Sequence, residues 1–119
     1  MAYVDGYIVA IKKGRMDEYR KIAAEAAAVW KEYGATRTVE AEADDVPYGE
    51  ITSFPRAVQA QEGETVVFSW IEYPDKATRD ACNAKVMADP RMDMDMATGP
   101  MNGKTLIFGG FVPFVDSAS

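Results

Sequence analysis

No histidine occurs among the 119 residues of this chain. Its absence excludes the Ser-His-Asp and Cys-His arrangements of nucleophilic enzymes, because both use an imidazole as the general base. It also excludes zinc, iron and copper sites that are built on histidine ligands. The GxGxxG motif, the P-loop and the CxxC pair are absent as well, so nothing supports a nucleotide, phosphate-loop or redox-pair site. We expect no cofactor and no bound metal.

Cysteine occurs once, as Cys82, so the chain cannot form an internal disulfide. A lack of disulfides is typical of proteins from a reducing compartment. The first residues lack the basic start and the long apolar core of a signal peptide. No apolar run approaches the roughly 20 residues that a membrane helix needs. We therefore expect a cytoplasmic protein of bacterial type that does not contact a membrane.

Positive charge is in the minority, with 13 lysines and arginines against 19 aspartates and glutamates, which gives a net charge of −6. Nucleic acids and anionic membranes are polyanions, so this charge disfavours both as partners. Hydrophobic residues make up 48% of the chain, too many for a disordered polypeptide. The length is that of one domain, and we expect residues 1–119 to fold as a single domain.

The spacing of apolar residues predicts four strands and two helices. Apolar residues recur at three- and four-residue steps in the helical segments, whereas the strand segments are apolar or alternating runs between turn residues. In chain order the predicted elements are a strand at 3–11, a helix at 15–33, strands at 35–43 and 65–73, a helix at 74–88 and a strand at 104–114. Residues 50–60 are expected to be extended or to form a ribbon, interrupted by Pro55.

This order of elements, β-α-β-β-α-β, is that of the ferredoxin-like fold. In that fold the first and third strands occupy the middle of a four-stranded antiparallel sheet. The strands at 3–11 and 65–73 are apolar on both of their alternating sides, as expected for strands that are covered on both faces. The sequence therefore predicts an α+β fold, a ferredoxin-like β-α-β-β-α-β sandwich.

Two helices cover only one face of such a sheet, and the other face would expose aromatic side chains to water. A second copy that packs sheet on sheet would cover this face, which predicts a homodimer. The alternative is that the long segment from Asp44 to Glu64 folds back over the same face. The sequence favours the homodimer, and it does not tell which face of the sheet holds the helices.

Two polar residues, Asp5 and Ser69, lie within the otherwise apolar central strands. Buried polar groups need partners, so these two either pair structurally or line a pocket. Asp5 is the candidate catalytic residue, because a buried carboxyl group can act as a general base near neutral pH.

Four residues are the candidates for ligand binding: Tyr7, Arg37, Ser69 and Trp70. Tyr7 and Trp70 could form an aromatic wall, although aromatic residues in the strands of a small domain more often belong to the core. Arg37 could bind an anion, although most surface arginines bind nothing specific. With Asp5, these residues are expected to line a pocket near the central strands, between the sheet and the helices.

Two other features have simple structural interpretations. Glu40, Glu42, Asp44 and Asp45 form an acidic cluster that could hold a divalent cation, but charge is also what an exposed edge strand favours. We interpret Cys82 as a quiet, partly buried residue, because a reactive thiol needs a nearby cation or helix N-terminus.

Several stretches of the chain resemble the YbaA-like family of small bacterial proteins: YVDGYIVAI, DDVPYGEIT, TVVFSWIEYPDKATRDACNAKVMADPRM and NGKTLIFGGF. The resemblance spans Tyr3 to Phe111. It implies a ferredoxin-like domain that pairs into a dimeric α/β barrel, and it implies no reaction, because none is established for that family. After Val39 the family pattern has a cysteine and a tryptophan, where this sequence has Ala41 and Glu42.

The wider barrel superfamily implied by this resemblance includes cofactor-free monooxygenases, haem-degrading enzymes and small-molecule isomerases. The haem-degrading members usually offer a histidine to the iron, and this chain has none. Fold alone does not transfer a reaction from one protein to another, so the resemblance leaves the function open.

Three functions remain open from the sequence. The first is a homodimer that binds a small apolar or aromatic molecule, or that transforms it without a cofactor. The second is a protein-interaction or structural dimer without catalysis. The third is RNA binding, suggested by labels on some relatives but disfavoured by the acidic charge and the lack of a basic, aromatic-studded patch. We take the first as the prediction, with its substrate and reaction unassigned.

Overall fold

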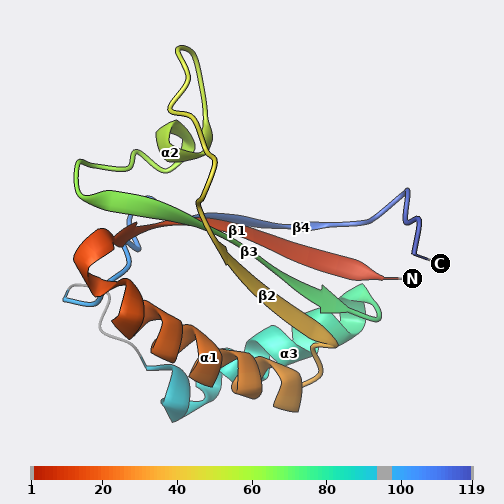
Figure 1. Cartoon of the computed structure of the whole chain (residues 1–119). Coiled ribbons are helices and arrows are strands. Elements are labelled where there is room, and N and C mark those ends of the chain that lie inside the picture. Colours follow the sequence, from red (N-terminus) through yellow and green to blue (C-terminus); the bar gives the residue numbers. More distant parts are fainter. Residues whose placement is uncertain (1, 94–97, 119) are drawn as a thin grey trace.

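The computed structural model describes residues 2–93 and 98–118. The elements follow one another in the order β1 (Tyr3–Lys12), α1 (Met16–Glu32), β2 (Arg37–Glu42), α2 (Phe54–Ala57), β3 (Glu64–Tyr73), α3 (Lys76–Ala88) and β4 (Ile107–Phe111), with 3₁₀ turns at Lys13–Arg15 and Pro90–Met92. Figure 1 shows α1 and α3 on one side of the sheet and the short α2 on the other.

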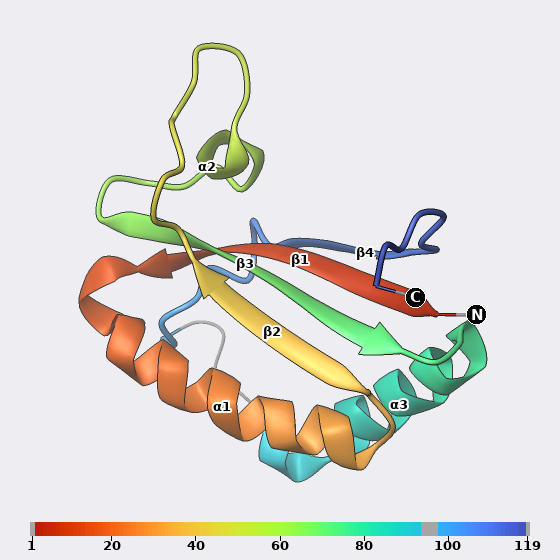
Figure 2. The same cartoon turned by 45° about the vertical axis from the view of Figure 1, so that its right-hand side comes forward.

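The four strands form one antiparallel sheet in the order β2-β3-β1-β4. This is the ferredoxin-like arrangement that the sequence predicts, with β1 and β3 in the middle. In Figure 2 the long helices lie next to each other beneath the sheet. No helix in the described part of the chain is long and apolar enough to cross a membrane.

The ends of the two long helices follow from local chemistry. Gly34 comes directly after the last turn of α1 with φ at 125°, a conformation that costs a residue with a Cβ more than it costs glycine. At the start of α3, the Asp75 carboxylate accepts a hydrogen bond of 2.7 Å from the backbone N–H of Thr78. That bond satisfies one of the free N–H groups of the first turn.

The side of the sheet that faces α1 and α3, called here the helix face, carries the main core. Alternate residues of β1 and β3 point to this side, and they pack against buried side chains such as Val29 of α1 and Val86 of α3. The strand residues of this core are Tyr3, Val9, Ile11, Val67, Ile71 and Tyr73. The opposite side of the sheet, formed by the intervening residues, is called the open face.

Two segments differ from the sequence prediction. Residues 50–60 contain the short helix α2 in place of a ribbon, and Pro55 lies in its first turn, where the missing N–H costs no helical hydrogen bond. Ser53 caps this helix, since its side chain accepts from the N–H of Arg56. The last strand is shorter than predicted, because a turn precedes Ile107 and a proline follows the strand at position 113.

The connection between β2 and β3, residues 43–63, forms an arm on the open-face side of the sheet (Figure 1). Val58 of the arm is fully buried and packs with Ala10 and Val66 at one end of the open face. Phe54 meets Phe68 edge to face, with ring centroids 5.8 Å apart. The arm therefore covers one end of this face, as the alternative to a dimer predicted, and leaves the rest of it open.

Candidate functional site

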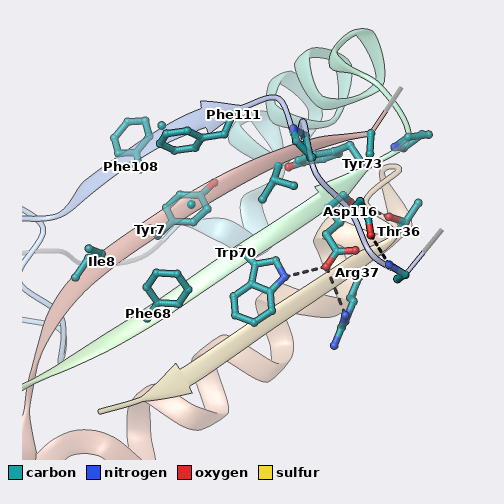
Figure 3. A pocket seen from close by; sticks show the side chains of 18 of the residues that line it. Tyr7, Ile8, Thr36, Arg37, Phe68, Trp70, Tyr73, Phe108, Phe111 and Asp116 are labelled. Atoms are coloured by element: carbon teal, nitrogen blue, oxygen red, sulfur yellow. Dashed lines mark hydrogen bonds and ion pairs between the residues drawn. The ribbon is translucent and has the colours of Figure 1, made fainter. Parts of the chain in front are cut away.

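A broad hollow lies on the open face, beyond the part that the arm covers. Its volume is about 1020 Å³, and its floor is formed by the strands themselves (Figure 3). Most of the residues that line it come from the four strands, and the C-terminal residues Pro113, Asp116 and Ala118 also border it. The larger apolar side chains of the lining are Val4, Ile8, Phe68, Trp70, Ile107, Phe108 and Phe111. This hollow is the candidate functional site.

The walls of the hollow are aromatic side chains that water reaches. Phe68 is 42% exposed and Phe111 is 63% exposed. The rings of Phe68 and Trp70 lie edge to face with centroids 5.7 Å apart, so they form one continuous surface. A contiguous apolar surface of this kind on a small domain is typical of an interface or a ligand site.

One end of the hollow is polar. The indole N–H of Trp70 donates a hydrogen bond of 2.8 Å to the Glu72 carboxylate. An Arg37 guanidinium nitrogen lies 3.6 Å from the same carboxylate, and Figure 3 shows Trp70 and Arg37 at this end of the hollow. Both charged side chains keep at least a third of their surface exposed, so a ligand in the hollow can reach either an acceptor or a cation there.

The structure divides the five predicted site residues between the two faces of the sheet. Arg37 and Trp70 belong to the open face and line the hollow. Asp5 and Ser69 belong to the helix face. Tyr7 borders the hollow from β1, but its ring packs against the helix-side core and stacks on Phe108 at 6.0 Å. A one-residue step along a strand reverses the side-chain direction, which separates Ser69 from Trp70.

Asp5 is 3% exposed and is held by Arg79 of α3. The Nε of Arg79 donates to both carboxylate oxygens at 3.1 and 3.0 Å, and Nη2 donates to Oδ1 at 2.9 Å. Hydrogen bonding to Asp5 raises the pKa of Arg79 above its usual range. The carboxylate therefore has a strong cationic partner, and a substrate would have to displace Arg79 before Asp5 could take a proton.

Tyr7 lies near this ion pair. Burial, and secondly the negative charge of Asp5, raise the pKa of Tyr7 well above its usual value. The phenol therefore keeps its proton across the physiological range, and it can donate a hydrogen bond but does not act as a base.

The structure brings Tyr19, Glu40 and Ser69 together on the helix face, a cluster that the sequence did not predict. Glu40 belongs to the edge strand β2 and is an exposed residue, and its carboxylate accepts hydrogen bonds from the Tyr19 hydroxyl, at 2.5 Å, and from Ser69. Partial desolvation of the carboxylate raises the pKa of Glu40, although these two hydrogen bonds oppose the shift. The three residues are far apart in the sequence, so no local pattern could have brought them together.

Cys82 is fully buried, and its Sγ lies 3.5 Å from the Trp30 carbonyl oxygen, to which it donates a hydrogen bond. Burial raises the pKa of its thiol. Both observations agree with the interpretation of a quiet cysteine, because a buried thiol with a raised pKa is a poor nucleophile.

Comparison with known sequences places the chain close to bacterial relatives. The sequence profile of a family described as "Protein of unknown function (DUF1428)" matches residues 2–103. The "Uncharacterized protein YbaA" of Escherichia coli strain K12 is 53% identical over 116 residues, which covers 98% of this chain and 99% of the relative. YbaA of Shigella flexneri matches to the same extent. The predicted resemblance to the YbaA-like family is confirmed.

Solved structures with the same architecture are distant in sequence. A mutant of SnoaB from Streptomyces nogalater, described as a cofactor-independent oxygenase, superposes with a TM-score of 0.62 at 13% identity, over 99% of this chain and 98% of SnoaB. A dimeric ferredoxin-like protein from an uncultured marine organism gives 0.58 at 11% identity, over 98% and 99% of the two chains. At these identities the likeness shows the fold alone.

Proposed function

The chain belongs to the DUF1428 family, and we propose that it is a homodimer that binds a small apolar or aromatic molecule in the hollow of the open face. The observation that carries the proposal is the aromatic surface around that hollow, made of the exposed rings of Phe68 and Phe111 and the half-buried ring of Trp70. The proposal places this dimer in the cytoplasm and treats residues 1–119 as its single folded unit.

A dimer is favoured because exposing the apolar side chains of the open face to water has an unfavourable free energy. Two sheets can pack face to face at about 10 Å, with their inner side chains interdigitated. A closed two-fold dimer uses the same patch on both copies, so a single apolar face is sufficient. The marine ferredoxin-like protein described as dimeric shares this fold, which supports a dimer here.

The ligand class follows from the lining. The volume of about 1020 Å³ is at the upper end for small-molecule sites, so a partner copy can fill part of the hollow and still leave room for a ligand. An aromatic molecule would stack or pack edge-on against Phe68 and Trp70. A polar substituent on it would meet Arg37 or Glu72 at the polar end.

Cofactor-free catalysis is the second candidate, with Asp5 as the general base. The observation that favours it is a buried carboxylate close to a protonated phenol, that of Tyr7. SnoaB, the cofactor-independent oxygenase with this fold, supports the same class of chemistry. This role requires a substrate that releases Asp5 from Arg79. The Asp5→Asn variant tests the role: it should lose any turnover of such a substrate that the wild type shows, while it remains a dimer.

Native mass spectrometry of the freshly purified chain tests the main proposal, because it reads the number of protomers and any retained molecule together. We expect a dimer with added mass. A monomer at micromolar concentration would contradict the packing of the open faces. A dimer that retains no small molecule, and takes none from a panel of aromatic compounds, would contradict ligand binding and favour a pure interaction protein.

A pair of variants locates the dimer contact. Phe68→Glu places a charge in the middle of the open face, and it should give a monomer, because a buried unpaired charge is costly. Met87→Glu is the matched control, since Met87 is 74% exposed and lies on α3, on the other side of the sheet. Circular dichroism confirms that both variants fold. If both remain dimers, the contact lies elsewhere.

A further inference from the structure

A narrow cleft lies on the helix face, between α1 and the edge strand β2, on the opposite side of the sheet from the hollow. Its volume is about 330 Å³. One wall is made of short side chains of α1, and the floor is Val67 of the central strand β3. The α1 residues along that wall are Ala23, Ala24 and Ala27.

The cleft contains a carboxylate that has neutral partners. Glu40 lines the cleft and accepts hydrogen bonds from the hydroxyl groups of Tyr19 and Ser69. Among the residues that the structure describes, no lysine or arginine forms an ion pair with Glu40.

Within the described part of the chain, the one cation that lines the cleft is already paired. Arg20 donates to Asp17 at 2.6 Å and to Glu42 at 2.5 Å, so both of its terminal nitrogens are engaged by carboxylates. The single positive charge of Arg20 is therefore outweighed by the negative charges of its partners Asp17 and Glu42. The negative charge of Glu40 adds to this excess. A cation that donates N–H hydrogen bonds stabilises a partly desolvated carboxylate.

We propose that this cleft binds a small primary amine, with the ammonium group on Glu40 and a short apolar body along the alanine wall. The ammonium group has three N–H donors, and the carboxylate still has acceptor capacity beyond the bonds from Tyr19 and Ser69. The Thr38 side chain lines the same cleft and offers a further acceptor.

Size and shape limit the amine. The volume lies near the lower end for small-molecule sites, which suits a single ring or a short chain. Alanine side chains leave this space open, and a larger residue in the same wall would fill it. Because the cleft is on the helix face, dimer formation through the open face does not cover it. Amine binding in the cleft and ligand binding in the hollow can therefore be tested independently.

Three probes of matched size test the proposal on the full-length protein: benzylamine, neutral benzyl alcohol and anionic benzoate. Each is titrated while backbone amide shifts are recorded by NMR. We expect benzylamine to produce saturable shifts in α1 and β2, and the other two probes to bind at least about tenfold more weakly, because a charge-assisted hydrogen bond is lost.

Variants assign the binding to the carboxylate and to the cleft. Glu40→Gln keeps the shape and removes the charge, and it should weaken benzylamine binding at least about tenfold. Glu25→Gln is the matched control, because it removes the charge of an exposed carboxylate on α1 that does not line the cleft. Its benzylamine affinity should stay within about threefold of that of the wild type. Ala27→Leu should block the cleft while Glu40 stays in place.

Several results would overturn the proposal. Equal binding of benzylamine and benzyl alcohol would show that the charge has no role. An unchanged affinity in Glu40→Gln, or an equal loss in Glu25→Gln, would remove Glu40 as the anchor. Shifts confined to the open face would place the amine in the hollow. The monomeric Phe68→Glu variant should still bind benzylamine, which separates this site from the proposed dimer.

Discussion

Gly110 of β4 should tolerate no larger residue, although its backbone needs no glycine, since its φ does not lie in the left-handed region. A Cβ at this position would lie 2.2 Å from the Tyr3 hydroxyl oxygen and 2.6 Å from Nη2 of Arg79. Ordinary van der Waals contact begins at 3.4 Å, so both side chains would have to move by a large fraction of an ångström or more.

Neither neighbour can move freely. Tyr3 is 9% exposed and belongs to the helix-side core. Arg79 lies over the Tyr3 ring, 5.0 Å from its centroid, and holds the buried Asp5 carboxylate. Overpacking a core costs about 1–3 kcal/mol, and breaking a buried ion pair costs about 3–5 kcal/mol. Arg79 keeps some access to water, so we expect Gly110→Ala to lower the free energy of unfolding by about 2–4 kcal/mol.

Gly109→Ala is the matched control on the same strand. Its added Cβ would meet nothing closer than Cε1 of Phe111 at 3.7 Å. An alanine there should change the free energy of unfolding by no more than about 1 kcal/mol. Urea unfolding followed by tryptophan fluorescence measures both variants, at one protomer concentration because the stability of a dimer depends on it.

Equal stabilities of Gly110→Ala and Gly109→Ala would refute the steric argument. A second measurement tests whether part of the destabilisation comes from disturbing the ion pair between Arg79 and Asp5. In an Asp5→Asn background the guanidinium of Arg79 has already lost its carboxylate, so Gly110→Ala should cost less than in the wild type. Full additivity of the two substitutions would show that the cost comes from Tyr3 alone.

Two further predictions concern titratable groups. The Cys82 thiol is buried and burial raises its pKa, so its alkylation by iodoacetamide at pH 8 should be at least about a hundredfold slower in the native protein than in urea; equal rates would contradict its burial. Hydrogen bonds from Thr78 lower the pKa of Asp75, so the stabilisation from this helix cap is present above the unfolded-state pKa of about 3.9 and is lost as the pH falls through the lower folded-state pKa. The stability difference between wild type and Asp75→Ala should therefore be largest near neutral pH and shrink below about pH 4, and a difference that grows on acidification would contradict the cap.

The order and type of the long elements could be predicted because they depend on local patterns. The three- and four-residue steps of the apolar residues in α1 and α3 and the apolar strands β1 and β3 are visible in the sequence. The helix α2 was missed because Pro55 reads as an interruption. In the structure it lies in the first helical turn behind the Ser53 cap, where proline is compatible with a helix.

The candidate site was predicted less completely, and the reason lies in β1 and β3 themselves. Both strands are apolar on their two sides, so alternation separates Trp70 from Ser69 without telling which of them faces the helices. The sequence therefore grouped Arg37 and Trp70 with Asp5, whereas the structure places them on opposite faces. The catalytic role of Asp5 and the ligand-binding roles of the other residues stay predictions.

The sequence by itself determined the order and type of the long helices and strands, the central position of β1 and β3 and the lack of histidine chemistry, because each depends on residue type and short-range spacing. Only the tertiary structure decided which side of each strand is covered, how the arm closes one end of the open face, and that Arg79 reaches Asp5. It also brought Tyr19, 21 residues away, to Glu40. These features depend on contacts between distant segments, and packing of the whole chain, not local propensity, selects them.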